Sequence, residues 1–221
     1  MSCRLLLVRH GETVDNVNRI MQGQTQGRLT LNGIEQAREL GRQLRGEHID
    51  VFLSSDLARA VETLRIIVEE RPTPSPSRGE EPTPNPSRGE GGEMPLCDNN
   101  PLSERVSTPL PAGRGRGVGL LPSGRGRGVG LLLRERDWGS FTGRYIPDLK
   151  DEVWPDDIET LEQMKARARR FLDYVRDHYQ GKTVLAVGHG IINKAIQSVY
   201  TGKPMNEIQK MANCEVRVLE L

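Results

Sequence analysis

The sequence has few cysteines and no long hydrophobic run, and each shortage excludes a class of protein. Its three cysteines, Cys3, Cys97 and Cys214, are odd in number and form no C-x-x-C pair. This argues against a disulfide framework and favours a reducing compartment, so a cytoplasmic location is expected. The apolar run from Leu5 to Val8 is too short for a signal peptide, and no stretch approaches about 18 apolar residues. We therefore expect no association with a membrane.

An excess of charge of one sign is also missing. The chain has 31 basic and 30 acidic residues and a formal net charge of +1. A strong overall field that attracts nucleic acid or an anionic membrane is thereby excluded. Any binding of anions has to be local.

Aromatic residues make up only 4% of the chain and hydrophobic residues 35%. One region that is rich in proline and glycine lowers these averages. Residues 71–130 hold 11 of the 14 prolines and 12 of the 24 glycines. They contain two imperfect repeats, PTPSPSRGEE with PTPNPSRGEG and PAGRGRGVGLL with PSGRGRGVGLL. Such sequence cannot bury enough apolar surface to offset the entropy of ordering it. We predict a single domain over residues 1–221, interrupted by a flexible insertion at 71–130.

The GRGRG stretches leave one alternative open, which is binding of RNA through the insertion. Arginine-glycine segments bind RNA by phosphate contacts and stacking. These stretches lack interleaved aromatic residues and carry two arginines each, so we expect no nucleic-acid partner.

Outside the insertion, apolar runs alternate with amphipathic stretches, as in a parallel sheet with covering helices. The predicted fold class is α/β, with three α/β/α layers and a mainly parallel central sheet. Strands are expected at residues 5–8, 49–55, 131–139, 182–190 and 214–221, the last at an edge. Helices are expected at residues 30–46, 56–70, 158–179 and 192–202, the first capped by Thr30 or Asn32.

Polar side chains that could take part in catalysis or in binding follow several of these strands. Arg9 and His10 end the first strand, and His189 lies at the end of the strand over 182–190. Arg59 lies one turn into the helix after the second strand, and Glu135 is placed at the end of the third. Ligands bind at the carboxyl ends of strands in open α/β sheets, so we expect these five side chains in one crevice.

Two imidazoles, two guanidiniums and one carboxyl group suit phosphoryl transfer. Guanidiniums bind phosphate oxygens through paired hydrogen bonds. A neutral imidazole can attack phosphorus and form a phosphohistidine, and a second imidazole can donate to a phosphoryl oxygen. A carboxylic acid can protonate the leaving alcohol and then accept a proton from water. This chemistry requires no metal and no cofactor.

The motifs LVRHGETVDN, LTLNGIEQA, SSDLARAVET, LRERDWGSFTG and AVGHG resemble the successive signatures of the histidine phosphatase superfamily, the phosphoglycerate mutase-like branch 1. The resemblance covers nearly all of the 161 residues outside the insertion. It implies the phosphoglycerate mutase-like fold, with His10 as the phosphorylated nucleophile and Glu135 as the proton donor. It further implies a phosphate pocket that contains Arg9, Arg59 and His189, a phosphoryl contact from Asn16, and substrate contacts from Gln22 and Gly23.

The resemblance predicts a phosphomonoesterase that acts on a small phosphorylated metabolite. Mutase-type phosphoryl transfer is the first alternative, although no counterpart of the mutases' basic, proline-rich extension follows Glu135. A catalytically impaired enzyme is the second, because an insertion before Glu135 can displace that group. A zinc site is the third, since His10 and Glu12 have the H-x-E spacing of zinc deaminases, but their P-C-x-x-C partner is absent. Sugar phosphates, phosphoglycerates and ribazole phosphate all remain open as substrates, as does the oligomeric state.

Overall fold

The computed structural model describes residues 2–71 and 127–221. The strands are β1 (Arg4–Arg9), β2 (Val51–Ser54), β3 (Thr183–Gly188) and β4 (Val216–Glu220). The helices are α1 (Val14–Val17), α2 (Leu31–Gln43), α3 (Ala58–Glu70), α4 (Arg127–Leu132), α5 (Leu161–His178) and α6 (Gly190–Thr201). Short 3₁₀ turns cover η1 (Leu44–Gly46), η2 (Gly139–Phe141), η3 (Ile146–Leu149) and η4 (Met205–Glu207).

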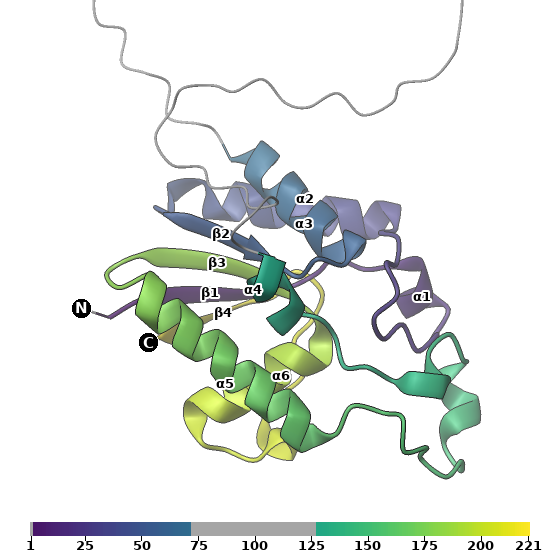
Figure 1. The fold of residues 1–221 in the computed structure, drawn as a ribbon. Coiled ribbons are helices and arrows are strands. Elements are labelled where there is room, and N and C mark those ends of the chain that lie inside the picture. The colour runs from purple at the N-terminus through teal and green to yellow at the C-terminus, as the bar shows by residue number, and fades with distance from the viewer. Residues whose placement is uncertain (1, 72–126) are drawn as a thin grey trace, which may run out of the picture. The chain divides into compact units, whose positions relative to one another are not determined.

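The four strands form one mixed sheet in the order β2-β3-β1-β4. Strand β1 is parallel to β3, with Arg9 opposite Gly188, and β2 is also parallel to β3. Strand β4 runs antiparallel to β1 at the edge of the sheet, where an edge strand was predicted. Helices α2 and α3 cover one face and α5 and α6 the other, which confirms the predicted three-layer α/β/α architecture (Figure 1).

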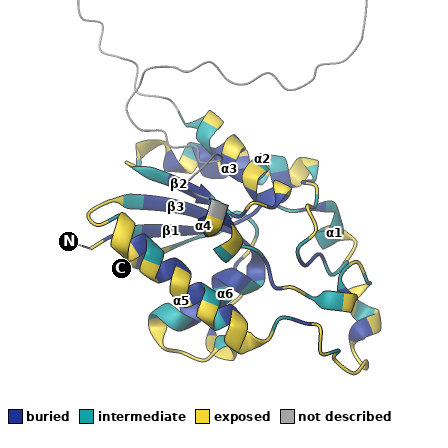
Figure 2. Ribbon diagram, in the orientation of Figure 1, coloured by how far each residue is buried: buried dark blue, intermediate teal, exposed yellow. Residues whose placement is uncertain are grey.

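The apolar run in β1 is continuous because both faces of the sheet are covered. Leu5 and Leu7 pack in the core cluster that contains residues of α5 and α6. Leu6 and Val8 point the opposite way, into the cluster formed with α2 and α3. Burying a leucine side chain contributes about 1.5–3 kcal/mol, so both clusters hold the central strand firmly (Figure 2).

Two threonines set the starts of the helices that flank the sheet. The Thr30 side chain accepts a hydrogen bond from the Gly33 amide, so Thr30 rather than Asn32 caps α2. Thr160 and Gln163 form a reciprocal capping box at the start of α5, which begins at Leu161, three residues after the predicted start. Both caps satisfy amides that the first turn of a helix leaves without partners.

The prediction of a strand over 131–139 is wrong. Residues 127–132 form helix α4, and residues 133–138 have no regular secondary structure before η2. Val129 and Leu133 are buried four positions apart, which is the spacing of one helix face, whereas Leu131 between them is exposed. A short run of leucines fits either element by pattern alone, and here packing against α5 and β2 selects the helix.

The described residues extend into both ends of the predicted insertion, whose limits stay a prediction. Arg71 is described, and its Nη2 donates a hydrogen bond to the carbonyl of Glu47. Residues 127–130 belong to α4, and Val129 lies in the core. The remaining residues of the predicted insertion, 72–126, lie outside the described residues. They include both pairs of repeats apart from residues 127–132, which end the second Gly-Arg repeat.

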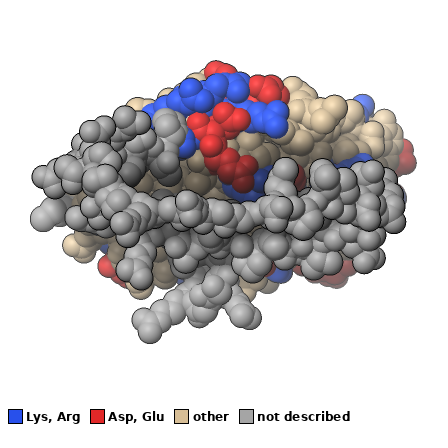
Figure 3. Space-filling model, turned by 90° about the horizontal axis from the view of Figure 1, so that it is seen from above, with Lys and Arg blue, Asp and Glu red and all other residues tan. Residues whose placement is uncertain are grey.

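The outer surface of α2 and α3 carries charges of both signs (Figure 3). Arg42 pairs with Glu35 at 2.6 Å, and Arg65 pairs with Glu69 at the same distance. This mixture agrees with a sequence of near-zero net charge. None of the helices in residues 2–71 and 127–221 is long and apolar enough to cross a bilayer.

Candidate active site

A pocket of about 220 Å³ lies where β1 ends and α6 begins. Seven of the eight predicted site residues line it, and these are Arg9, His10, Asn16, Gln22, Gly23, Arg59 and Glu135. The eighth, His189, is completely buried directly behind His10. The parallel pairing of β1 with β3 brings the two histidines together, because Arg9 and Gly188 are register partners and each precedes a histidine.

His10 is held in one tautomer. Its Nδ1 lies 2.7 Å from the carbonyl oxygen of Gly11, which can only accept, so Nδ1 carries the hydrogen. Its Nε2 is therefore an unprotonated acceptor, and the Nε–H of Arg59 donates to it across 3.3 Å. Burial, followed by the charges of Arg59 and Arg9, holds the pKa of His10 well below its usual value of 6.5. The ring is neutral at neutral pH, with a lone pair on Nε2.

His189 stands at the start of α6, and its ring centroid lies 5.0 Å from that of His10. Burial, then Arg59 and His10, lower its pKa well below 6.5, so this imidazole is also neutral. Neither of its ring nitrogens has a hydrogen-bond partner among the described residues. A neutral imidazole keeps one N–H, so His189 has a donor that no other described residue uses.

Arg59 projects from α3 and is 1% exposed. Its Nη2 donates to the carbonyl of Gly23 at 2.9 Å, and its Nη1 donates to the carbonyls of Thr25 and Gln26. Burial lowers the pKa of Arg59 to about 10, and the group stays charged at neutral pH. Gly23 has a φ of +51°, a conformation that favours glycine, and this turn aims its carbonyl at the guanidinium.

Arg9 and Lys210 supply further positive charge to the same pocket. Arg9 donates from Nη1 to the Met211 carbonyl at 2.8 Å, while its buried Nε has no partner among the described residues. Lys210 lines the pocket too, and burial together with Arg9 lowers its pKa. Sequence reasoning missed Lys210, because it lies in an irregular segment before β4 with no motif around it.

Glu135 lies in the irregular segment after α4 and not at the end of a strand. Its carboxylate accepts hydrogen bonds from the amides of Arg136, Ile191 and Ile192 at 2.8–3.2 Å. Two of these amides belong to the first turn of α6, which follows His189 directly. The Glu135 carboxylate is therefore held at the same end of α6 that carries His189.

Asn16 and Gln22 form a polar wall of the pocket. The Asn16 Oδ1 accepts from the Thr13 amide in the cap of α1 and from Asn213 Nδ2. Its Nδ2 donates to Gln22 Oε1 at 3.4 Å, and Gln22 Nε2 in turn donates to Asp15 at 3.0 Å. Asn213, which sequence reasoning did not single out, also donates to the carbonyl of His10.

Of the aromatic residues that follow Glu135, one lines the pocket. Trp138 is a lining residue, with the guanidinium of Arg136 stacked 4.6 Å from its ring centroid. Phe141 is buried in a separate small cluster with Leu149 and Ile158, so its role is packing. Arg134 pairs with Asp56 instead of entering the pocket.

The described residues contain no group of three or more His, Cys, Asp and Glu side chains that could hold a metal ion. What they do bring together is a nucleophilic ring nitrogen, fixed cations and a carboxyl group around one small cavity. Such a set can bind a tetrahedral oxyanion, attack its central atom and exchange a proton with a departing or entering oxygen.

Comparison with known proteins gives a consistent result. A family model described as the histidine phosphatase superfamily (branch 1) matches residues 5–78 and 131–221. The adenosylcobalamin/alpha-ribazole phosphatase of Escherichia coli is 42% identical over 71 residues, which are 32% of this chain and 35% of that protein. A Bacillus subtilis protein called uncharacterized phosphatase PhoE is 28% identical over 208 residues, or 94% of this chain and 82% of its own.

Among solved structures, a mycobacterial hydrolase superposes with a TM-score of 0.68 at 19% identity. The superposition covers 100% of this chain and 92% of that one. At this identity the likeness concerns the fold alone.

Proposed function

The chain belongs to the histidine phosphatase superfamily (branch 1), and we propose that it hydrolyses phosphate monoesters of small molecules through a phosphohistidine at His10. One observation carries the proposal. The Gly11 carbonyl holds the hydrogen of His10 on Nδ1, which leaves a lone pair on Nε2, and burial together with the nearby cations keeps the ring neutral. A neutral, fixed imidazole beside two guanidiniums is the arrangement that attack on a phosphate ester requires.

In the first step, Nε2 of His10 attacks phosphorus and the bond from phosphorus to the alcohol oxygen breaks. A protonated Glu135 carboxyl gives its proton to the departing oxygen, so a neutral alcohol leaves. The Nε–H of Arg59, which meets Nε2 in the free protein, then donates to a phosphoryl oxygen. The unused N–H of His189 is a donor for a second phosphoryl oxygen.

In the second step, a water molecule attacks the phosphorus of the phosphohistidine. The Glu135 carboxylate takes the proton from this water, the phosphorus–nitrogen bond breaks, and inorganic phosphate is released. The lone pair returns to Nε2, so His10 regains its starting state. The reaction consumes one water and one ester and needs no redox partner.

The remaining lining residues divide between the phosphoryl group and the rest of the substrate. Arg9 and Asn16 line the same pocket as His10, which supports contact of their side chains with phosphoryl oxygens. Gln22 lies on the same wall, and the Gly23 carbonyl orients Arg59. We assign substrate contact to Gln22 and positioning of Arg59 to Gly23.

The test is a screen of phosphorylated metabolites, in the presence of EDTA, followed by acid-labile phosphate trapping on the protein. We expect release of inorganic phosphate and a trapped phosphohistidine. Loss of activity in EDTA would contradict the metal-independent scheme. Phosphate transfer between positions of one substrate without release would favour a mutase, and inactivity on every ester would favour an impaired family member.

A further inference from the structure

Glu135 lies in a segment without regular secondary structure, so contacts with neighbouring residues have to fix its position. Helix α4 ends at Leu132, and no helix or strand is present from Leu133 to Trp138. A displacement of about 1 Å in a catalytic group can cost about a hundredfold in rate. If Glu135 exchanges a proton with substrate, as in the proposed function, its main chain has to be fixed by neighbours.

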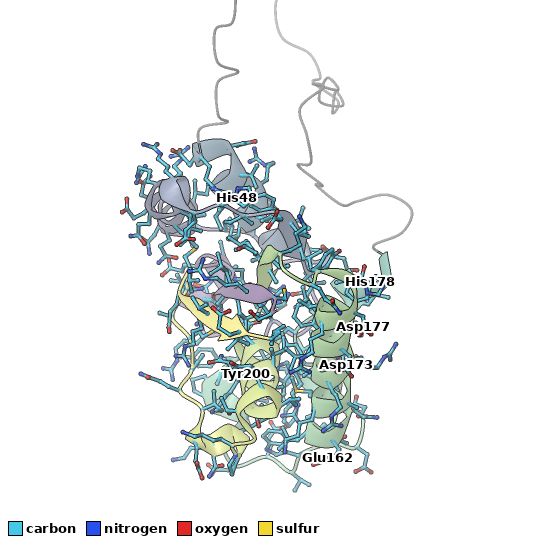
Figure 4. All side chains as sticks on the ribbon, turned by 90° about the vertical axis from the view of Figure 1, so that its left-hand side faces the viewer. His48, Glu162, Asp173, Asp177, His178 and Tyr200 are labelled. Atoms are coloured by element: carbon cyan, nitrogen blue, oxygen red, sulfur yellow. The ribbon has the colours of Figure 1, made fainter. Side chains whose placement is uncertain are left out.

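Arg167, on α5, fixes that main chain from one side. Its Nη1 donates to the carbonyls of Leu132 at 3.0 Å and Arg134 at 2.6 Å, and its Nη2 lies 3.4 Å from the carbonyl of Glu135. Helix α5 runs from Leu161 to His178, with Glu162 near one end and His178 at the other (Figure 4). One guanidinium on helix α5 thus donates to three main-chain carbonyls within residues 132–135, and the Glu135 carbonyl also accepts a hydrogen bond from Gln24 Nε2 at 3.3 Å.

Glu159, just before the cap of α5, fixes the residues that follow Glu135. Its carboxylate accepts from the Asp137 amide at 3.1 Å, and its own amide donates to the Asp137 carbonyl at 2.9 Å. Its carbonyl accepts from Nε of Arg136 at 2.7 Å. Arg167 therefore contacts residues 132–135, and Glu159 contacts the next two residues, Arg136 and Asp137.

The two residues also form an ion pair with each other. Nε and Nη2 of Arg167 meet the two carboxylate oxygens of Glu159 at 2.9 and 2.8 Å. The side chains are only 15% and 13% exposed. This two-point geometry orients the guanidinium fork and leaves its other edge free for the loop carbonyls.

We propose that Arg167 and Glu159 are positioning residues that hold the main chain of residues 132–137, so that the Glu135 carboxyl faces the leaving group. Neither side chain contacts the Glu135 carboxylate, which the amides at the start of α6 hold. The main chain of the acid is attached to α5 and its side chain to α6, and the two helices pack on each other. This inference rests on the proposed function.

The test compares two esters of similar shape whose leaving groups differ in their need for a proton. The p-nitrophenolate ion leaves readily without protonation, whereas the leaving oxygen of phenyl phosphate is more basic and benefits from an acid. The value of kcat/KM reports the first step, in which the ester bond breaks. Arg167→Gln and Glu159→Gln should lower kcat/KM about tenfold or more for phenyl phosphate and less than about threefold for p-nitrophenyl phosphate.

Three further measurements keep the test decisive. Arg167→Lys retains the charge but not the fork, so it should recover only part of the loss on phenyl phosphate. Arg170→Gln, an exposed arginine on the same helix, should leave both substrates unchanged. Thermal melting identifies any variant that fails to fold, and in that event Glu159→Gln and Arg167→Lys decide the matter.

An equal loss on both esters, or no loss on either, would overturn the positioning role while leaving the proposed function intact. An equal loss is the result expected if Arg167 acted only through general stability or through its charge near His189. A wild-type chain that hydrolyses neither ester would instead count against the proposed function itself.

Discussion

The Nε–H of Arg59 donates to Nε2 of His10 across 3.3 Å, in a region where both side chains are almost fully buried. Burial is the main reason why His10 stays neutral, and the adjacent cation adds to it because it opposes protonation of the imidazole. The neutral ring is the form that the proposed attack on phosphorus requires. The same cation is then available to an incoming phosphoryl group. One contact thus serves the free protein and the bound state in different ways.

Replacing His10 tests the centre of the proposed chemistry. His10→Ala should lower turnover of a generic aryl phosphate at least about a thousandfold, because no other lining residue can form the covalent intermediate. Its melting temperature should stay close to that of the wild type. His48→Ala removes an imidazole that is exposed on the surface and should leave turnover unchanged. Retained activity in His10→Ala would refute the nucleophile assignment.

The two buried histidines predict a particular dependence of stability on pH. Their folded-state pKa values lie well below 6.5, so between pH 6.5 and about 5 the unfolded chain binds protons that the folded chain does not. Stability is therefore fully present above pH 6.5 and falls as the pH decreases, by about 1 kcal/mol per pH unit for each histidine.

Urea unfolding at pH 7.5, 6.0 and 5.0 measures this effect. Carboxyl groups whose pKa the fold lowers, such as Asp56 beside Arg134, are ionised in both states over most of that window. The double variant His10→Asn, His189→Asn should show a flatter profile than the wild type. Identical profiles would mean that the histidines are not the source of the dependence.

A backbone contact behind His10 predicts intolerance of a methyl group. A Cβ added to Gly33 would lie 2.1 Å from the carbonyl oxygen of Glu12, and one added to Gly11 would lie 2.5 Å from the Gly33 oxygen. Gly33→Ala should therefore lower the free energy of unfolding by about 1–3 kcal/mol. Gly46→Ala, where nothing lies within 4 Å, is the matched control and should be neutral in chemical denaturation.

Lys210 should contribute to binding of the ester. It lies beside Arg9 at the pocket, where a positive charge attracts the phosphate dianion. Lys210→Met is expected to raise KM about three- to tenfold with little change in kcat, since a partly exposed charge contributes modestly. Lys203→Met, on the surface after α6, should not alter KM. Steady-state kinetics at low salt would reveal the difference, and an unchanged KM would remove Lys210 from the binding site.

We also propose that residues 1–221 form one domain interrupted by an insertion that the fold does not need. Within residues 2–71 and 127–221, two large core clusters already cover both faces of the sheet. Replacing residues 73–125 by a Gly-Ser linker of about 15 residues should give a folded, active protein, because loop closure depends weakly on length. Loss of the cooperative melting transition would show that the segment is structural.

The histidine pair could be predicted from the sequence because its position follows from topology. Two continuous apolar runs that each end in His-Gly must be buried parallel strands, and neighbouring parallel strands end at the same edge. The pairing of β1 with β3 confirms this reasoning. Arg59 was predictable for a similar reason, since it lies one turn after the end of β2.

Glu135 was identified as a candidate, but its surroundings were not. The leucines before it satisfy a strand pattern, and only the packing of Val129 and Leu133 against α5 makes them a helix. Arg167 and Lys210 carried no signal at all, because one occupies an ordinary amphipathic helix and the other an irregular segment. Their importance arises from contacts between residues more than thirty positions apart, which local sequence patterns do not contain.

The solitary ring nitrogens of His189 have a thermodynamic consequence. A buried polar atom without a partner costs about 1–3 kcal/mol, and among the described residues no group bonds to the ring nitrogens of His189. A tetrahedral anion such as vanadate that accepted the N–H would relieve it. Binding of such an anion would then raise the melting temperature. The thermal stability measured for this protein would therefore depend on the oxyanion concentration of the buffer.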